Sequence, residues 1–280
     1  LKYAIFVIVL LVLYYCFPKK YRWYVLLAGS MAYYVIICKW YVLFIIFTIC
    51  TTYGSTIWID KLLKKQNAIV KSHKEDWDRQ TRKEYKEKGR KKRVAVMLFA
   101  LLCNFGILAF LKYIPYAGEI GLLLPLGISF YTFQSMGYVM DVYREIVEPE
   151  KNFLKVALFV SFFPQIIQGP IAIYDKLAGQ LYEGHSLRLE NLQKGALLVL
   201  WGVMKKLVIA DRAVNIINFV MDKPMDFSGT YVFFAAVVYA LQLYADFSGG
   251  IDIVRGIAEM FGITMSTNFN HPYFSRSLTE

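Results

Sequence analysis

The chain has 280 residues, of which 57% are hydrophobic and only 19% carry a charge. Because a soluble domain has about 25% charged residues, this composition excludes an ordinary soluble domain and indicates a membrane protein. The net charge of +11 does not require a nucleic-acid partner, since most of the excess basic residues lie in one segment beside apolar runs. The cysteines lie in apolar runs without metal-ligand spacing, which favours buried thiols over a metal site or a disulfide framework: Cys16, Cys38, Cys50 and Cys103.

Three apolar runs open the chain, at residues 1–17, 23–38 and 40–59. Each has about the length that a helix needs to cross a membrane, and Trp and Tyr at their ends suit the membrane–water interface. The first run lacks the small-residue cleavage site of a signal peptide, so a transmembrane helix is the better interpretation. We therefore predict that residues 1–60 form N-terminal transmembrane helices.

A strongly basic segment follows at residues 61–93. The positive-inside rule predicts that this segment is a cytoplasmic loop. The basic turn at residues 19–22 falls on the same side if the first three runs alternate across the bilayer, which places Leu1 outside. The lysines and arginines of the loop either attract anionic lipid headgroups or an acidic acyl donor, or act only as a topology signal on a solvated helix.

Two later apolar segments, 120–144 and 153–171, are interrupted by prolines and carry polar side chains at membrane depth. Proline removes a backbone donor, and polar groups inside a bilayer usually face a protein interior or a cavity. We expect kinked or re-entrant helices that line a cavity, with helix packing through small residues as the alternative for the glycine and serine. The residues concerned are Pro125, Gly127, Ser129, Gln134, Pro164 and Gln168.

Charged residues also lie inside the last two apolar runs. Residues 195–220 include Lys205 and Lys206, which either extend to the membrane interface or meet the phosphates of a coenzyme. The run that begins at residue 231 ends at Asp246, beside Ser248 and the glycine pair 249–250. An ionisable group at this depth is a functional candidate by default, and the glycines permit a break in the helix.

The order of these motifs resembles the membrane-bound O-acyltransferase family, in particular its bacterial branch that includes alginate O-acetyltransferase. The branch pattern Gln-x-Tyr-x-Asp-Phe-Ser-Gly is matched at residues 242–249, and an Asn-Phe-Asn-x-Pro-Tyr segment follows at 268–273. The run Pro-Leu-Gly-Ile-Ser-Phe-Tyr-Thr-Phe-Gln at 125–134 and the motif Trp-Gly-x-x-Lys-Lys-x-x-Ile-Ala-Asp at 201–211 are similar to the same branch.

The resemblance implies an all-α, multi-pass transmembrane protein with broken or re-entrant helices, in which residues 94–280 belong to the conserved core. It implies transfer of an acyl group, acetyl in the alginate-type branch, from a cytoplasmic thioester to hydroxyls of an extracytoplasmic polysaccharide or cell-wall polymer. The donor would be acetyl-CoA or an acyl carrier thioester, with no bound cofactor and no metal. The expected setting is a bacterial cell membrane, with the lipid bilayer and an extracytoplasmic acyltransferase protein as partners and no nucleic acid.

Several residues take supporting roles under this resemblance, as hydrogen-bonding groups along an acyl path: Gln134, Gln168, Asp246, Ser248, Asn270 and Arg276. No catalytic residue is assigned, because the family's histidine is expected beyond Glu280. His271 precedes Pro272, which biases it to an extended conformation, and we do not expect it to be the base. Leu1 at the start and the capping-box spacing of Ser277 and Glu280 at the end lead us to expect a fragment that is inactive by itself.

Two functions from other classes compete with acyl transfer. A transporter or flippase for lipid-linked or polysaccharide substrates would also have broken helices and buried polar groups, but it should show internal repeats, and no half-to-half similarity is evident. A structural membrane subunit would have no chemistry at all. Transfer of label from acetyl-CoA to a hydroxyl acceptor distinguishes an acyltransferase from both.

Overall fold

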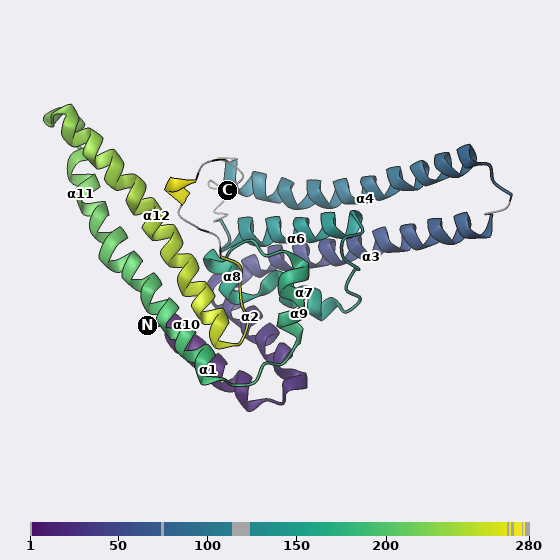
Figure 1. Ribbon diagram of the computed structural model, residues 1–280, viewed down its shortest axis with the longest axis horizontal. Helices are drawn as coiled ribbons and strands as arrows, with labels where there is room; N and C mark the ends of the chain where they lie inside the picture. Colours follow the sequence, from purple (N-terminus) through teal and green to yellow (C-terminus); the bar gives the residue numbers. More distant parts are fainter. Residues whose placement is uncertain are drawn as a thin grey trace. The chain divides into compact units, whose positions relative to one another are not determined.

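The computed structural model describes residues 2–73, 76–113, 124–267, 269, 272–275 and 277 (Figure 1). Within these residues every regular element is a helix, which confirms the all-α prediction. The chain divides into two compact units. The terminal unit comprises Leu1–Lys19, Ile167–Pro170 and Gly184–Glu280, and the central unit comprises Lys20–Ile166 and Ile171–Glu183. In the part of the chain that the structure describes, three helical segments are long and apolar enough to cross a membrane: Lys19–Ser72, Arg79–Tyr113 and Gly229–Met260.

The central unit is built on a long antiparallel hairpin of α3 (Val42–Ser72) and α4 (Arg79–Tyr113), with α6 (Ile128–Tyr143) packed beside both (Figure 1). The side chain of Asn104 on α4 donates to Thr51 Oγ1 on α3 at 2.9 Å, so this polar group in the apolar part of α4 is satisfied across the hairpin. The other helices of the unit are α2 (Arg22–Cys38), α7 (Phe153–Ser161), α9 (Tyr174–Tyr182) and the start of α8 (Phe163–Gln168).

The basic segment 61–93, predicted as a loop, is helical for most of its length. Helix α3 continues to Ser72 and α4 begins at Arg79. Lys, Arg, Glu and Gln are good helix formers, so the charged residues extend the two transmembrane helices instead of ending them. The basic residues therefore lie on a helical hairpin, named here the basic arm (residues 61–93).

Helix α6 also differs from the prediction, because Pro125 and Gly127 precede it and do not interrupt it. Gly127 adopts a left-handed conformation (φ 69°) as the residue before the helix, and a Cβ there would overlap the backbone carbonyl of Ile166. Glycine is thus required both for the backbone conformation and for the close approach. From Ile128 to Tyr143 the helix is continuous. Residues 114–123, which complete the predicted broken segment, lie outside the described residues.

The terminal unit is organised around α12 (Gly229–Met260), which runs antiparallel to a continuous helical stretch (Figure 1). That stretch consists of α10 (Leu189–Met204), a π-helix (Lys205–Ala210) and α11 (Asp211–Met221). Helix α1 (Lys2–Cys16) packs near the end of α12, where the Tyr15 hydroxyl donates to the Met260 carbonyl at 2.7 Å. The glycine pair 249–250 lies inside α12 without breaking it, so the break that the sequence permits does not occur.

Candidate functional site

Helices α10 and α12 touch backbone to backbone at two glycine pairs. A Cβ added to Gly202 would lie 2.5 Å from the Gly249 carbonyl oxygen, and one added to Gly256 would lie 2.6 Å from that of Gly195. Real Cβ atoms essentially never come within 3.0 Å of such an atom. The glycines are therefore needed for helix contact, as small residues are at membrane helix interfaces, which explains why α12 keeps them without a break.

This close contact brings the charged residues of the two helices together. Lys205 Nζ lies 2.7 Å from Asp252 Oδ2, and Arg255 Nη1 lies 3.3 Å from the other oxygen of the same carboxylate. The side chains of Lys205 and Asp252 are 14% and 12% exposed. Because an unpaired charge inside a membrane protein is expensive, this buried pair favours one register of α10 on α12. Two alternatives for Lys205 were extension to the interface and contact with phosphate, but here it binds a carboxylate.

Lys206 makes a second, more open pair. Its ammonium group contacts Asp246 Oδ1 and lies 4.0 Å from Asp211 Oδ1. The side chains of Lys206 and Asp246 are 45% and 39% exposed, about three times as much as the Lys205–Asp252 pair. The predicted site residue Asp246 is thus a partner of Lys206, and this pair is accessible where the other is buried.

The π-helix explains how two consecutive lysines reach the same neighbouring helix. Neighbouring residues of an α-helix point about 100° apart, but the turn that contains Lys205 and Lys206 is wider than an α-turn. π-turns are rare and occur frequently at functional sites. Here the wide turn directs both ammonium groups toward α12, where Lys205 contacts Asp252 and Lys206 contacts Asp246.

Two more predicted residues are found at the same stretch of α12: Ser248 belongs to the helix, and Gln168, at the end of α8, packs against it. The Gln168 side chain rests against Gly250, where an added Cβ would come within 2.5 Å of Gln168 Cδ. Gly250 is one turn from Asp246 and shares its helix face. Ser248 is only 3% exposed, and its hydroxyl oxygen has no hydrogen-bond partner among the residues that the structure describes.

The chain that follows α12 folds back along it. The ring of Tyr244 packs edge-on against Phe269 and Tyr273, and the Tyr273 hydroxyl donates to the Ala240 carbonyl at 2.6 Å. The same Tyr244 ring lies 5.9 Å from Lys205 Nζ. The two sequence motifs at 242–249 and 268–273 therefore meet around one tyrosine, next to the charged pairs.

In the central unit, Gln134 belongs to a helix break that α7 and α8 form at Phe162. Phe162 leaves the helical conformation (ψ 110°), which frees the Phe159 carbonyl and the Phe163 N–H from the bond they would otherwise share. Gln134 Nε2 donates to the Phe159 carbonyl at 2.9 Å, and the Phe163 N–H donates to Ser30 Oγ at 3.1 Å. The predicted broken helix at 153–171 is confirmed, and side chains of α6 and α2 satisfy its backbone.

No protein-family model matches the chain. It is 32% identical over 222 residues to the peptidoglycan O-acetyltransferase of Helicobacter pylori, which covers 66% of the chain and 42% of the relative. It is 36% identical over 161 residues to the probable alginate O-acetylase AlgI of Pseudomonas aeruginosa, with coverages of 57% and 30%. The teichoic acid D-alanyltransferase of Bacillus subtilis is 25% identical over 161 residues, with coverages of 55% and 40%.

The chain belongs to the membrane-bound O-acyltransferase family. It spans less than half the length of each of these three relatives. The family resemblance read from the motifs is thereby confirmed, including its alginate O-acetylase branch.

Of the site residues expected for this O-acyltransferase family member, Asp246 and Ser248 lie on one stretch of α12, and Gln168, at the end of α8, rests against Gly250 of that stretch. Gln134 lies in the central unit with a bond to the backbone. Asn270, Arg276 and His271 lie outside the described residues. The functional assignment of the six predicted site residues, which do not include His271, stays a prediction.

Sequence reasoning missed Asp252 and Arg255, because neither lies in a motif that carried the family resemblance. A usable signal was present: α12 has two aspartates in an apolar helix, and the preceding helix has two lysines that could balance them. Among the described residues, no group of three or more His, Cys, Asp or Glu side chains is placed to hold a metal ion.

Proposed function

We propose that this protein is an integral-membrane O-acyltransferase that moves an acyl group, acetyl in the first instance, from a cytoplasmic thioester to hydroxyls of an extracytoplasmic polysaccharide or cell-wall polymer. The observation that carries the proposal is the 32% identity over 222 residues to a peptidoglycan O-acetyltransferase. The similarity to proteins named for alginate and teichoic acid supports a polymer of the cell envelope as the acceptor class. The setting is a multi-pass protein of a bacterial cell membrane, with a separate extracytoplasmic acyltransferase as partner.

The donor in this proposal is acetyl-CoA or an acyl carrier thioester. Acyl transfer to a hydroxyl needs a base that takes the hydroxyl proton and donors that stabilise the developing oxyanion. We assign different roles to the two ion pairs between α12 and the helical stretch opposite it. Lys205 and Asp252 hold the two helices together, while the more open Lys206 and Asp246 face the acyl path. A cation at that position would act on the thioester oxygen or on the donor's phosphates.

We do not assign the base to a histidine of these 280 residues. His73 is exposed on the basic arm, and the backbone N–H of His185 donates to the Tyr14 hydroxyl beside Gly262. Neither lies on the α12 stretch with Asp246. His271 lies outside the described residues, and because it precedes Pro272 it is not proposed as the base.

The test is acyl transfer in membranes that contain the intact enzyme together with its native envelope polymer. Acetyl-CoA labelled in the acetyl group should place alkali-labile label on the polymer, and Asp246→Asn should reduce the transfer while the protein is still inserted at normal levels. Transfer from an acyl carrier thioester alone would identify the other donor. Movement of the polymer or its lipid-linked precursor across the membrane without acyl transfer would overturn the proposal in favour of a transporter.

A further inference from the structure

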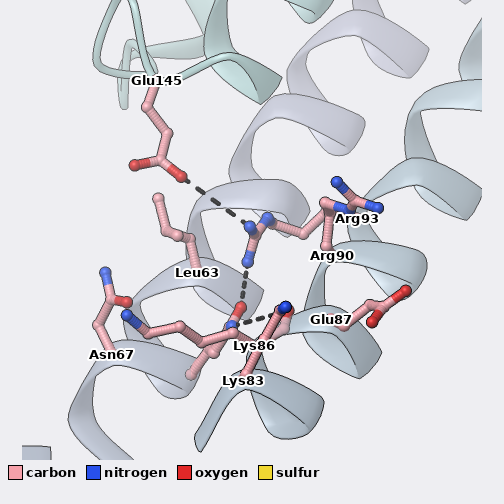
Figure 2. Close-up of a pocket in the computed structure, with 9 residues that line it drawn as sticks. Leu63, Asn67, Lys83, Lys86, Glu87, Arg90, Arg93 and Glu145 are labelled. Atoms are coloured by element: carbon pink, nitrogen blue, oxygen red, sulfur yellow. Dashed lines mark hydrogen bonds and ion pairs between the residues drawn. The ribbon is translucent and has the colours of Figure 1, made fainter. Parts of the chain in front are cut away.

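The basic arm contains a pocket whose positive charge is not balanced by the residues around it. The pocket has a volume of about 480 Å³ and lies between α3 and α4, with one residue contributed from the end of α6 (Figure 2). This volume falls within the range of about 300–1,000 Å³ that is usual for small-molecule sites. All of its residues belong to the central unit. They are Leu63, Gln66, Asn67, Lys83, Lys86, Glu87, Arg90, Arg93 and Glu145.

Arg93 is the buried centre of this pocket. Only 8% of the residue is exposed, and Figure 2 shows its guanidinium group directed toward Glu145. Nη1 donates to Gln66 Oε1, and Nη2 lies 3.9 Å from Glu145 Oε1, at the outer limit of an ion pair. Nε is buried and has no hydrogen-bond partner among the residues that the structure describes. The carboxylate of Glu145, which pairs with Arg93 at this limiting distance, is 55% exposed. The buried charge of Arg93 is therefore weakly paired, which favours the binding of an anion.

Gln66 holds Arg93 in place and is itself tightly held. It is 6% exposed, and its Nε2 donates to the Lys86 carbonyl at 3.0 Å while its oxygen accepts from Arg93. Gly89 makes this arrangement possible, because a Cβ there would lie 2.6 Å from Gln66 Cδ. The guanidinium group is thus positioned before any ligand binds, which reduces the ordering that binding requires.

Three further basic side chains surround this buried group: Lys83, Lys86 and Arg90 are exposed at the pocket, and the described residues form no ion pair with them. Glu87 and Glu145 are the only acidic residues of the lining, so four basic side chains face two acidic ones. Arginine binds phosphate through two parallel hydrogen bonds, and lysine binds it as a point charge. This combination suits a phosphate group better than a carboxylate.

The pocket also lies where a phosphate group is available. Arg93 is followed directly by the apolar run 94–113, so the pocket is at the level where α4 enters the membrane. The positive-inside rule puts this level at the cytoplasmic surface, where phospholipid headgroups and soluble phosphate compounds are both present.

We infer that the pocket of Gln66, Arg90 and Arg93 is a binding site for a phosphate-bearing anion at the membrane surface. The headgroup of an anionic phospholipid and a soluble phosphate compound share the chemistry that this pocket recognises. The inference does not rest on acyl transfer, since the binding can be measured without any acceptor.

The test compares binding by two variants with the same loss of charge on the same helix. Purified protein in a nonionic detergent is titrated with short-chain phosphatidylglycerol, with short-chain phosphatidylcholine as the headgroup control, and separately with pyrophosphate and coenzyme A. The increase in unfolding temperature gives the affinity. The pocket variant is Lys86→Gln with Arg90→Gln, and the matched control is Lys88→Gln with Lys91→Gln, whose side chains line a different cavity beyond Gln66.

The pocket variant should bind the phosphate ligand about 30-fold more weakly, which corresponds to about 1 kcal/mol for each basic side chain near a membrane surface. The control variant should lose at most about threefold through general electrostatics. Glu145→Gln should bind the anion more tightly than the original protein, because it removes the carboxylate that competes for Arg93 and changes a side chain that is itself 55% exposed. This variant keeps the test decisive if the double variant folds poorly.

Stabilisation by phosphatidylglycerol but not by pyrophosphate or coenzyme A identifies a lipid headgroup as the source, and the reverse result identifies a soluble phosphate compound. Equal losses in the two double variants would show that the arm attracts anions only through its overall charge and would overturn the site. The absence of stabilisation by every phosphate probe would overturn it as well.

Discussion

The contact of α10 with α12 predicts opposite effects for two glycine-to-alanine substitutions. In Gly202→Ala the new Cβ would lie 2.5 Å from the Gly249 carbonyl oxygen and 2.8 Å from the Ile253 backbone nitrogen. Neither atom is the end of a flexible side chain, so the helices must separate. In Gly137→Ala, on helix α6, nothing lies within 4 Å of the new Cβ. The two variants make the same chemical change inside a helix, one against a neighbouring backbone and one into open space.

The magnitude follows from the distances. To bring the Cβ of Gly202→Ala to at least 3.0 Å from the carbonyl oxygen, the helices must part by about 0.5 Å or more there. Forcing an extra methyl group into a packed interface costs about 1–3 kcal/mol, and the upper end applies because backbone atoms are on the other side. Gly137→Ala should instead gain about 0.5–1 kcal/mol, because alanine replaces glycine within a helix.

The assay is reversible unfolding of the purified protein in mixed micelles by increasing mole fraction of denaturing detergent, followed by circular dichroism. Gly202→Ala should lower the free energy of unfolding and Gly137→Ala should leave it unchanged or raise it. Gly249→Ala, whose Cβ would meet the Gly202 carbonyl oxygen at 2.8 Å, should behave like Gly202→Ala. If Gly202→Ala and Gly137→Ala had the same effect, the backbone contact between α10 and α12 would be refuted.

Three further predictions concern single contacts. Asp252→Asn leaves both Lys205 and Arg255 without their carboxylate and should cost about 3–5 kcal/mol of unfolding free energy, the usual cost of breaking a buried ion pair; Asp211→Asn, at a 50% exposed side chain, is the control and should change it little. Gln134→Leu leaves the Phe159 carbonyl unpaired and should cost about 1–3 kcal/mol of unfolding free energy, and unchanged stability in this variant would contradict the role. In the intact enzyme, His73→Ala and His185→Ala should retain acyl transfer in membranes, and loss of transfer with normal folding in either variant would mean that the base lies within the described residues.

The apolar runs predicted most of the helices, because a length of apolar residues that spans a bilayer has few alternatives to a helix. Helices α1 and α2 begin and end close to the predicted boundaries. The basic segment 61–93 was predicted as a cytoplasmic loop, with a solvated helix as one alternative, and the helical conformation of most of it could not be decided from its charge for a general reason. The positive-inside rule reports on which side of the membrane a segment lies and says nothing of its conformation, and lysine and arginine are good helix formers.

The candidate site could be predicted only in part. Asp246 stands out in the sequence as a carboxylate in an apolar run, but its partner Lys206 belongs to another helix, and the π-turn that aims it has no clear sequence pattern. The glycines at 249–250 suggested a broken helix, because a glycine in a sequence can indicate either a helix break or a close contact with another helix. Gly202 faces Gly249, and only the folded chain brings these two residues together.

The helix break at Phe162 was easier to predict than its repair. Pro164 lacks the N–H that would bond the Val160 carbonyl, so the sequence signals a broken helix there. Which side chains satisfy the freed groups depends on α2 and α6, and these lie far away in the sequence: Ser30 and Gln134. Gln134 was singled out correctly as a polar residue at depth, while Ser30 gave no signal at all.

The π-turn at Lys205–Ala210 has a consequence for how this helix tolerates changes in length. A π-turn holds one residue more than an α-turn in nearly the same rise, so it behaves as an inserted residue that the helix has absorbed locally. Removing a single residue from a helix normally rotates everything beyond it by about 100°. Here a one-residue deletion restores an ordinary helix, and the apolar face of α11 that packs on α12, with Ile217 and Val220 buried, keeps its orientation. The deletion removes only the arrangement in which two neighbouring lysines both reach α12. At this turn the helix can therefore lose one residue without a change in how α11 packs on α12.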